Sequence, residues 1–213
     1  MHKNLDFHQI LKDHTQQAHS NAESQPFIEE LMSGKLNQSA YLAYLTSLLP
    51  IYQKMEEIFK SRPNSILLNY FDHRALDRTE KLQKDIETLS IKNGYVDREF
   101  SSTEKYTTRI NRDISDVALL AHHYIRYLGD LSGGQAISRL VARHYAISAE
   151  ALNFYDFTSI GDSVFYKKRY RDLLNFVFQE ESERQEFLLE VTELYKLNAM
   201  IFAELGTIDK FDS

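Results

Sequence analysis

The chain has 213 residues, a formal charge of −6 and no cysteine, which excludes disulfides, thiolate metal sites and cysteine nucleophiles. Its acidic balance argues against general nucleic-acid binding. No apolar run reaches the roughly 18–20 residues that span a bilayer, and the polar N-terminus is unlike a signal peptide, so we expect a cytoplasmic protein without a membrane anchor.

Apolar residues recur at helical spacing through almost the whole sequence, and alternating strand patterns are absent. The chain has only three prolines and seven glycines, a composition that favours helices. In chain order, the pattern predicts helices near 5–23, 26–33, 38–61, 74–89, 104–127, 134–145, 148–155, 163–177 and 182–204. We therefore expect one all-α domain that covers residues 1–213.

The first predicted helix has two different faces. One face carries the polar residues Lys12, Gln16, His19 and Glu23. A second face is largely apolar and is expected to pack on the core through Phe7, Leu11, His14, Ala18 and Ala22. The polar face is a candidate edge of a pocket, where His19 could bind a metal and Glu23 could hold its other ring nitrogen. The alternative is an ordinary histidine on a solvated helix face.

The segment RYLGDLSGGQ, residues 126–135, contains Gly129, Gly133 and Gly134 within a helical pattern. Each glycine costs a helix roughly 1 kcal/mol relative to alanine, so three in six residues suggest close approach of another group to the backbone. With the carboxylate of Asp130 among them, we interpret the segment as one wall of a ligand pocket. The alternatives are a tight helix crossing without a ligand and an i,i+4 ion pair between Arg126 and Asp130.

Two further histidines, His122 and His123, precede the glycine segment. Adjacent helical residues point about 100° apart, so at most one of them faces a pocket, and we expect both to be packed or hydrogen-bonded. The sequence contains no Glu-x-x-His pair, which excludes a ferritin-like di-iron site. It also lacks HExxH, a Walker loop and a dinucleotide fingerprint.

The segment YKKRYRDLLN places Lys167 and Arg171 one turn apart on one helix face, where they could clamp a pair of carboxylates. Lys168 and Arg169 fit either a solvated face or a docking surface for an acidic partner. In the closing helix, Phe202 fits a pocket wall and plain core equally well.

Four segments together resemble the heme oxygenases: LKDHTQQAHSNAE, RYLGDLSGGQ with its flanks, LNFYDF followed by YKKRYRDLLN, and LNAMIFAELG. They extend from about Leu11 to Gly206, nearly the whole chain. The resemblance implies heme between a proximal helix, whose His19 ligates the iron, and a glycine-kinked distal helix. On that distal helix, Asp130 is expected to anchor a water network that assists oxygen activation.

The resemblance also implies roles for neighbouring residues. Tyr124 and Arg126 are expected to join or organise the network around Asp130. The other expected heme contacts are Lys12, Glu23, Gly129, Ser132, Gly133, Gly134, Lys167, Arg171 and Phe202. Of these, Lys12, Lys167 and Arg171 are expected near the propionates. Gln16 stands where some relatives have a basic residue, which puts one propionate contact in question.

The implied reaction is oxidative opening of heme by dioxygen and electrons to biliverdin, carbon monoxide and ferrous iron, with heme as both substrate and prosthetic group. No flavin or nicotinamide motif is present, so we expect a monomeric enzyme that receives electrons from a separate ferredoxin or flavoprotein reductase. A non-catalytic heme carrier or sensor and a helical scaffold without a ligand are the alternatives. A thiaminase of the same fold would need a cysteine, which the chain lacks.

Overall fold

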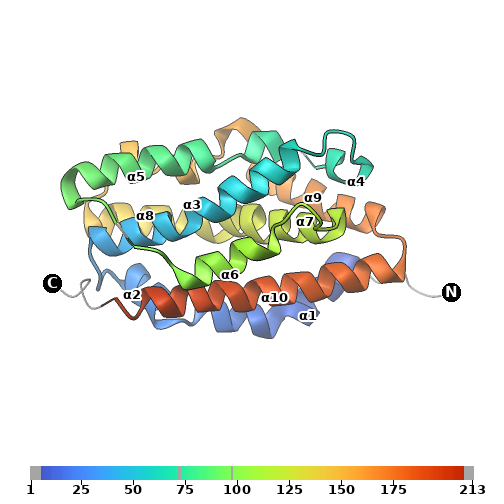
Figure 1. The fold of residues 1–213 in the computed structure, drawn as a ribbon, viewed down its shortest axis with the longest axis horizontal. Helices are drawn as coiled ribbons and strands as arrows, with labels where there is room; N and C mark the ends of the chain where they lie inside the picture. Colours follow the sequence, from blue (N-terminus) through green and yellow to red (C-terminus); the bar gives the residue numbers. More distant parts are fainter. Residues whose placement is uncertain (1–5, 72, 97, 209–213) are drawn as a thin grey trace.

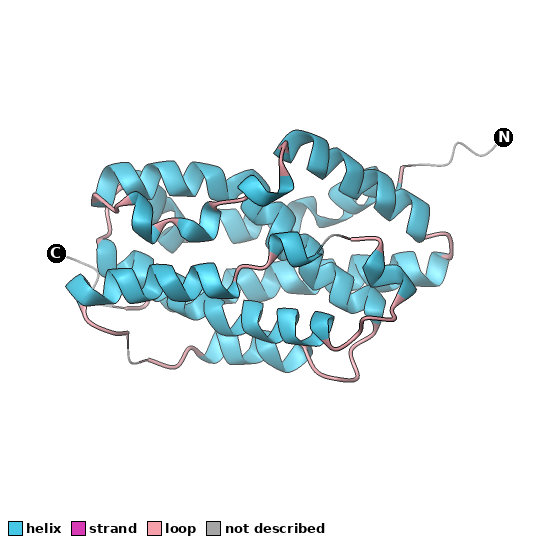
Figure 2. Ribbon diagram, turned by 90° about the horizontal axis from the view of Figure 1, so that it is seen from above, coloured by secondary structure: helices cyan, strands magenta, loops and turns pink. Residues whose placement is uncertain are grey.

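The computed structural model describes residues 6–71, 73–96 and 98–208, and the regular structure within these ranges is helical, without a strand (Figures 1 and 2). The all-α prediction is confirmed. Within the same ranges, no helix has the length and apolar character needed to cross a membrane. The α-helices are α1 Phe7–Glu23, α2 Pro26–Ser33, α3 Gln38–Lys60, α4 Ile66–Asn69, α5 Thr79–Asn93, α6 Ser101–Arg109, α7 Asp116–His123, α8 Gln135–Tyr145, α9 Ser163–Val177 and α10 Glu181–Leu205.

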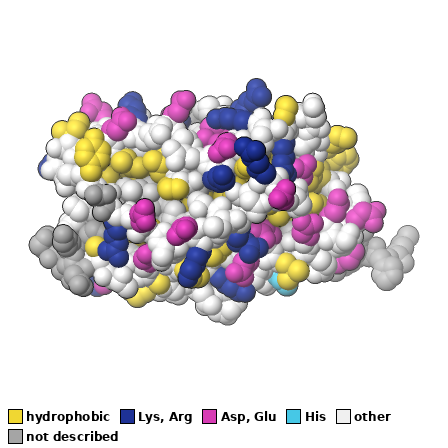
Figure 3. Space-filling model, in the orientation of Figure 1, with side chains coloured by type: hydrophobic (Ala, Val, Ile, Leu, Met, Phe, Trp, Pro, Cys, Tyr) yellow, Lys and Arg dark blue, Asp and Glu magenta, His cyan; other side chains and the backbone are white. Residues whose placement is uncertain are grey.

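The two longest helices, α3 and α10, organise the bundle. α10 packs against α1 and α7, and α3 packs against α5 (Figure 1). The side chain of Asn37 starts α3 by accepting a hydrogen bond from the backbone N–H of Ala40 (3.1 Å). On the face of the molecule seen in Figure 3, acidic and basic side chains are interspersed rather than gathered by sign.

Residues 124–134, which we call the π segment, connect α7 to α8 without interrupting the helical path. Two π-helical stretches, Tyr124–Leu128 and Asp130–Gly134, meet at Gly129, whose own dihedral angles are helical (φ −60°, ψ −51°). π-helical turns are rare and occur frequently at functional sites. The local change in backbone hydrogen bonding therefore marks this segment independently of its glycines.

The single helix predicted over 104–127 is wrong, because α6 ends at Arg109 and α7 begins at Asp116. Apolar spacing continues through the break because Ile110 and Ile114 both pack on the core. Ser115 then starts α7 by accepting a hydrogen bond from the backbone of the first turn (2.9 Å). The apolar spacing therefore predicted the burial of these two residues correctly, but not the backbone conformation between the helices.

The start of α5 was also predicted too early, near residue 74. A 3₁₀ turn covers His73–Leu76, and the helix begins at Thr79. The cause is distant in sequence: the carboxylate of Glu56 on α3 accepts hydrogen bonds from the backbone N–H groups of Arg78 (2.6 Å) and Thr79 (3.1 Å). These donors have no partner inside the helix, so a remote carboxylate fixes where it begins.

Two smaller predictions differ from the structure. The helix expected near 148–155 consists of two 3₁₀ turns, Ala149–Ala151 and Asn153–Tyr155. On α1, the expected apolar face is buried at its ends, but His14 is exposed. Thr15 is buried in its place, because its hydroxyl can donate to the backbone carbonyl of Leu11 (2.8 Å).

Gly129 and Gly134 should respond in opposite directions to alanine. A Cβ at Gly129 would meet no atom within 4 Å, whereas a Cβ at Gly134 would lie 2.9 Å from Cδ1 of Tyr155. Gly129→Ala should therefore raise the free energy of unfolding by about 0.5–1 kcal/mol through better helix propensity. Gly134→Ala should lower it by about 1–3 kcal/mol through overpacking. Urea denaturation measures both, and a Gly134→Ala variant as stable as the parent protein would contradict the close packing.

Candidate functional site

A cavity of about 510 Å³ opens between α1, α2, α3, the π segment and α10, a size typical of ligand pockets. Eight of the residues predicted for the site line it: His19, Glu23, Arg126, Gly129, Asp130, Gly133, Gly134 and Phe202. The rest of the wall consists mainly of aromatic and aliphatic side chains from α2, α3, α8 and α10. The structure thus brings the polar face of the first helix and the glycine segment to one cavity.

His19 lies on the cavity wall, with its side chain 41% exposed. Its Nδ1 lies 3.2 Å from Oε2 of Glu23, one helical turn further along α1. The imidazole also makes an edge contact with the ring of Tyr195 on α10, with the ring centroids 5.1 Å apart. Because Glu23 engages Nδ1, Nε2 is the nitrogen left for a ligand.

Gly129 and Gly133 leave the backbone of the π segment bare beside the cavity. No atom lies within 4 Å of the position that a Cβ would take at either residue. Helix crossing therefore does not explain these two glycines. It explains only Gly134, where the ring of Tyr155 takes the place of a side chain. A flat ligand can approach the backbone at the other two positions.

Asp130 sits on the same wall and is held from α3. The hydroxyl of Tyr52 donates a hydrogen bond to Oδ2 of Asp130 (2.5 Å). Burial raises the pKa of Asp130 to about 7, although Arg126, the bond from Tyr52 and Arg78 all act to lower it. A carboxyl group with a pKa near neutrality can both take up and release protons under ordinary conditions.

Arg126 is buried and reaches across to α10, where its guanidinium donates to Oδ1 of Asn198. The guanidinium carbon also lies 5.4 Å from the ring centroid of Tyr106. The i,i+4 ion pair with Asp130, one of the two sequence-based alternatives, is not formed. In a π-helical backbone, residues four apart no longer stack directly above one another, so Arg126 and Asp130 find separate partners.

Five expected contacts lie off the cavity wall: Lys12, Tyr124, Ser132, Lys167 and Arg171. Lys12 is exposed on α1. The Nζ atom of Lys167 lies 3.4 Å from the carbonyl oxygen of Leu131 and 3.5 Å from Oγ of Ser132, so α9 reaches the π segment. The Nε atom of Arg171 is buried without a hydrogen-bond partner.

Tyr124 packs into the core instead of facing the cavity. Its ring contacts the rings of Tyr170 and Phe187, with centroids 6.2 and 5.7 Å away. Burial raises the pKa of Tyr124 to about 12, so its hydroxyl stays protonated. The structure therefore places Tyr124, the first residue of the π segment, against the core rather than beside Asp130.

His122 and His123 are fully buried and lie off the cavity wall, packed as predicted. Nε2 of His122 lies 3.3 Å from Oε1 of Glu190, and Nδ1 of His123 lies 2.9 Å from the hydroxyl oxygen of Tyr170. Within the described ranges, His19 is the histidine that lines the cavity.

Five polar residues of the wall or its immediate support were not predicted from the sequence: Tyr44, Tyr52, Tyr155, Tyr195 and Asn198. A signal existed for two of them. Tyr195, Asn198 and Phe202 fall at i, i+3 and i+7 on α10, so the expectation for Phe202 extends to its neighbours. No such signal marks Tyr44 and Tyr52, because α3 is buried on almost every side and no face stands out.

The chain matches the heme oxygenase family model over residues 5–204. A heme oxygenase of Rhodella violacea is 30% identical over 202 residues, covering 92% of this chain and 86% of the relative. The solved heme oxygenase of Leptospira interrogans is 32% identical with a TM-score of 0.83, covering 94% of this chain and all of that one. Heme oxygenase-2 of Synechocystis in complex with heme and NO is 25% identical with a TM-score of 0.86, covering 94% of this chain and 85% of that one. From its cavity and from these matches over nearly its whole length, the chain belongs to the heme oxygenase family.

Proposed function

We propose that this chain binds heme in the 510 Å³ cavity and opens it to biliverdin, carbon monoxide and ferrous iron, using dioxygen and electrons from a separate ferredoxin or flavoprotein reductase. One observation carries the proposal: His19, the bare backbone of Gly129 and Gly133, and Asp130 all line one cavity. Heme degradation is the general activity of the family, and the heme complex of the Synechocystis relative supports the choice of ligand.

The residues present suit heme. A histidine backed by a carboxylate, as His19 is by Glu23, is a common arrangement for ligating iron. The open backbone at Gly129 and Gly133 accommodates the face of a flat macrocycle. The Nε atom of Arg126 is buried without a hydrogen-bond partner, so the wall also holds a polar group that a water or ligand can satisfy.

Bound heme would supply the iron that activates dioxygen as well as the ring that is opened. The protein's contribution is to direct protons. Tyr52 occupies Oδ2 of Asp130, which leaves Oδ1 free to hold a water. Because its pKa is about 7, Asp130 can accept a proton from such a water network and return it. Arg126, fixed by Asn198, organises the same network from the side.

The expected basic residues are proposed to set the orientation of the macrocycle. Lys12, Lys167 and Arg171 would pair with the two propionates, through charge-assisted hydrogen bonds. Lys167 already reaches the π segment at Ser132, and Arg171 lies one turn further along α9. Because the carboxylates lie at one edge of heme, the positions of these cations decide which edge of the ring faces Asp130.

Aerobic turnover of the hemin complex with ascorbate tests the proposed activity. The parent protein should turn from brown to green and yield biliverdin on chromatography. Asp130→Ala should bind hemin normally, because His19 is untouched, but should yield at least about tenfold less biliverdin once the proton-handling carboxyl is lost. A Soret band without ring opening in the parent protein would make it a heme carrier or sensor, and a normal yield from the variant would leave Asp130 a structural role.

Asp130→Asn supplies the matched control for folding, measured by urea denaturation without heme. The folded pKa of about 7 lies above the ordinary value of 3.8, so the folded protein keeps a proton that the unfolded chain releases between those pH values. The parent protein should therefore lose stability as the pH rises through this window. The variant should match it near pH 4 and exceed it by about 1–3 kcal/mol at pH 8. A difference independent of pH would contradict the raised pKa.

His19→Ala should weaken hemin binding without abolishing it, because apolar contacts and propionate pairing remain. We expect an altered Soret band, nearly complete loss of turnover and partial recovery of the spectrum on adding imidazole. His14 is an exposed histidine on the same helix, so His14→Ala is the control. It should change neither the Soret band nor turnover. An unaltered Soret band in His19→Ala would assign the ligand to another residue.

Lys167→Ala and Arg171→Ala should each reduce hemin affinity by about 0.5–2 kcal/mol, since charge-assisted bonds at a partly exposed rim are modest. The double variant should change the ratio of biliverdin isomers, because a rotated macrocycle presents a different edge to Asp130. Lys168→Ala is the control, since its ammonium pairs with Asp172 on the exposed face of α9 (2.7 Å). Chromatography measures the ratio of biliverdin isomers. An unchanged ratio in the double variant would rule out the orienting role of Lys167 and Arg171.

A further inference from the structure

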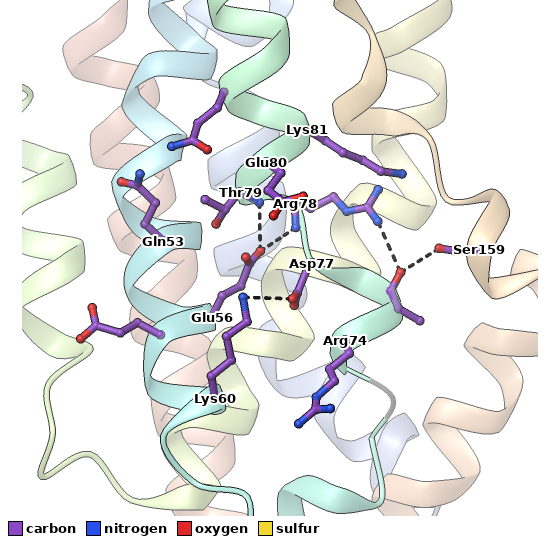
Figure 4. A pocket seen from close by; sticks show the side chains of 13 residues that line it. Gln53, Glu56, Lys60, Arg74, Asp77, Arg78, Thr79, Glu80, Lys81 and Ser159 are labelled. Carbon is purple, nitrogen blue, oxygen red and sulfur yellow. Dashed lines mark hydrogen bonds and ion pairs between the residues drawn. The ribbon is translucent and has the colours of Figure 1, made fainter.

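A second cavity, of about 710 Å³, lies beside α3 and the start of α5 (Figure 4). Its wall carries charges of both signs in equal number, from Glu56, Glu57, Lys60, Arg74, Asp77, Arg78, Glu80 and Lys81. Because the opposite charges balance, the wall has no preference for an anion or a cation. Among these wall residues we single out Glu56, which is only 4% exposed and points toward the first residues of α5.

One oxygen of Glu56 joins three elements of the fold. Oε1 accepts hydrogen bonds from the backbone N–H groups of Arg78 (2.6 Å) and Thr79 (3.1 Å), which start α5, and from the hydroxyl of Tyr127 (3.2 Å) in the π segment. A buried carboxylate is costly unless such donors surround it. Glu56 therefore ties α3, α5 and the π segment to a single point.

α3 holds the π segment at two places. Tyr52 and Glu56 are one helical turn apart on α3, and Tyr127 and Asp130 are three residues apart on the π segment. The hydroxyl of Tyr52 donates to Asp130, and that of Tyr127 donates to Glu56. The rings of Tyr52 and Tyr127 also pack together, with centroids 5.8 Å apart. The two bonds fix both the position and the rotation of the segment.

The anchor at Glu56 is itself rigid. Arg78, whose N–H it accepts, is 1% exposed, and its guanidinium donates to the carbonyl oxygens of Leu76 (2.6 Å) and Asp156 (2.5 Å). The same guanidinium lies 4.0 Å from the ring centroid of Phe157. The N-terminal end of α5 is therefore held by side-chain contacts as well as by Glu56.

We propose that Glu56 is a positioning residue: acting through Tyr127, it fixes the π segment and so places the carboxyl of Asp130 for the heme reaction. The inference rests on the function proposed for the first cavity. The bare side of the π segment offers no packing at Gly129 and Gly133, so loss of the Tyr127 bond removes one of the few contacts that oppose local opening of the segment.

Tyr127→Phe is the sharpest variant, because it removes the bond to Glu56 and leaves the cap of α5 intact. Tyr145→Phe is the control, since it removes a tyrosine hydroxyl away from the π segment, one that donates to the carbonyl oxygen of Leu31 (2.7 Å) and also contacts the carbonyl oxygen of Glu30 and the N–H of Leu36 (both 3.4 Å). Both are studied first without heme. The readouts are amide hydrogen exchange over residues 124–134 and titration of the Asp130 carboxyl by carbon-13 NMR.

The charged and titratable groups that interact with Asp130 are Arg126 on the π segment itself and, from other elements, Tyr44, Tyr52, Arg78, Tyr106 and Tyr155. All of them are unchanged in both variants. In Tyr127→Phe, exchange across the segment should accelerate about tenfold, because a hydrogen bond to a charged group is lost. The pKa of Asp130 should fall from about 7 toward its ordinary value, since a loosened segment admits water.

Both readouts must move in Tyr127→Phe and stay fixed in Tyr145→Phe. If either readout is unchanged in Tyr127→Phe, or if Tyr145→Phe changes either readout as much as Tyr127→Phe does, the positioning role is overturned. Loaded with hemin, Tyr127→Phe should lose turnover several-fold with unchanged hemin affinity. Glu56→Gln, which keeps an acceptor of the same size, should retain more turnover than Glu56→Ala. The proposed function is tested separately: if it is wrong, the parent protein itself does not open heme.

Discussion

The π segment has to keep one side free of side chains, and the rest of the site follows from that constraint. Gly129 and Gly133 forgo packing toward the cavity, so the segment is held by contacts made elsewhere along it. Asp130 is bonded from α3 and Arg126 from α10. Behind the bare side, Ile125, Tyr127, Leu128 and Leu131 pack in the core. The polar bonds are directional, so they add a fixed rotation of the segment to the burial that these apolar side chains supply.

Two carboxylates next to the same cavity have different environments. Glu23 is 68% exposed and lies 3.2 Å from the ring of His19 on its own helix. Asp130 is recessed among tyrosines and arginines, and burial raises its pKa to about 7. The same chemical group thus lies at the open edge of the cavity in one case and within its wall in the other.

The sequence predicted those features that depend on local spacing. The polar face of α1 and the glycine segment were identified from residues a few positions apart, and the structure brings both to one cavity. The break between α6 and α7 was missed because Ile110 and Ile114 continue the apolar pattern through a loop. The start of α5 was missed because it depends on Glu56, more than twenty residues earlier. Tyr52 was not predicted as a site residue for a similar reason. Its hydroxyl bonds to Asp130 in another helical segment, and spacing along one helix cannot reveal such a partner.

The π-helical hydrogen bonding of residues 124–134 also limits which changes of length the chain can tolerate. A π turn holds one residue more than an α turn, so deleting a single residue here would allow ordinary α-helical bonds to form. The residues beyond the deletion would keep nearly the same orientation relative to α7, because a π turn absorbs its extra residue. Ala136 and Ile137 would stay on the cavity wall and α8 would keep its face toward α2, while the wide turn beside the cavity would be lost. A deletion within α7 or α8 would instead rotate every later residue of the helix by about 100°, so the π segment is the part of this long helical path where a change of one residue can be absorbed.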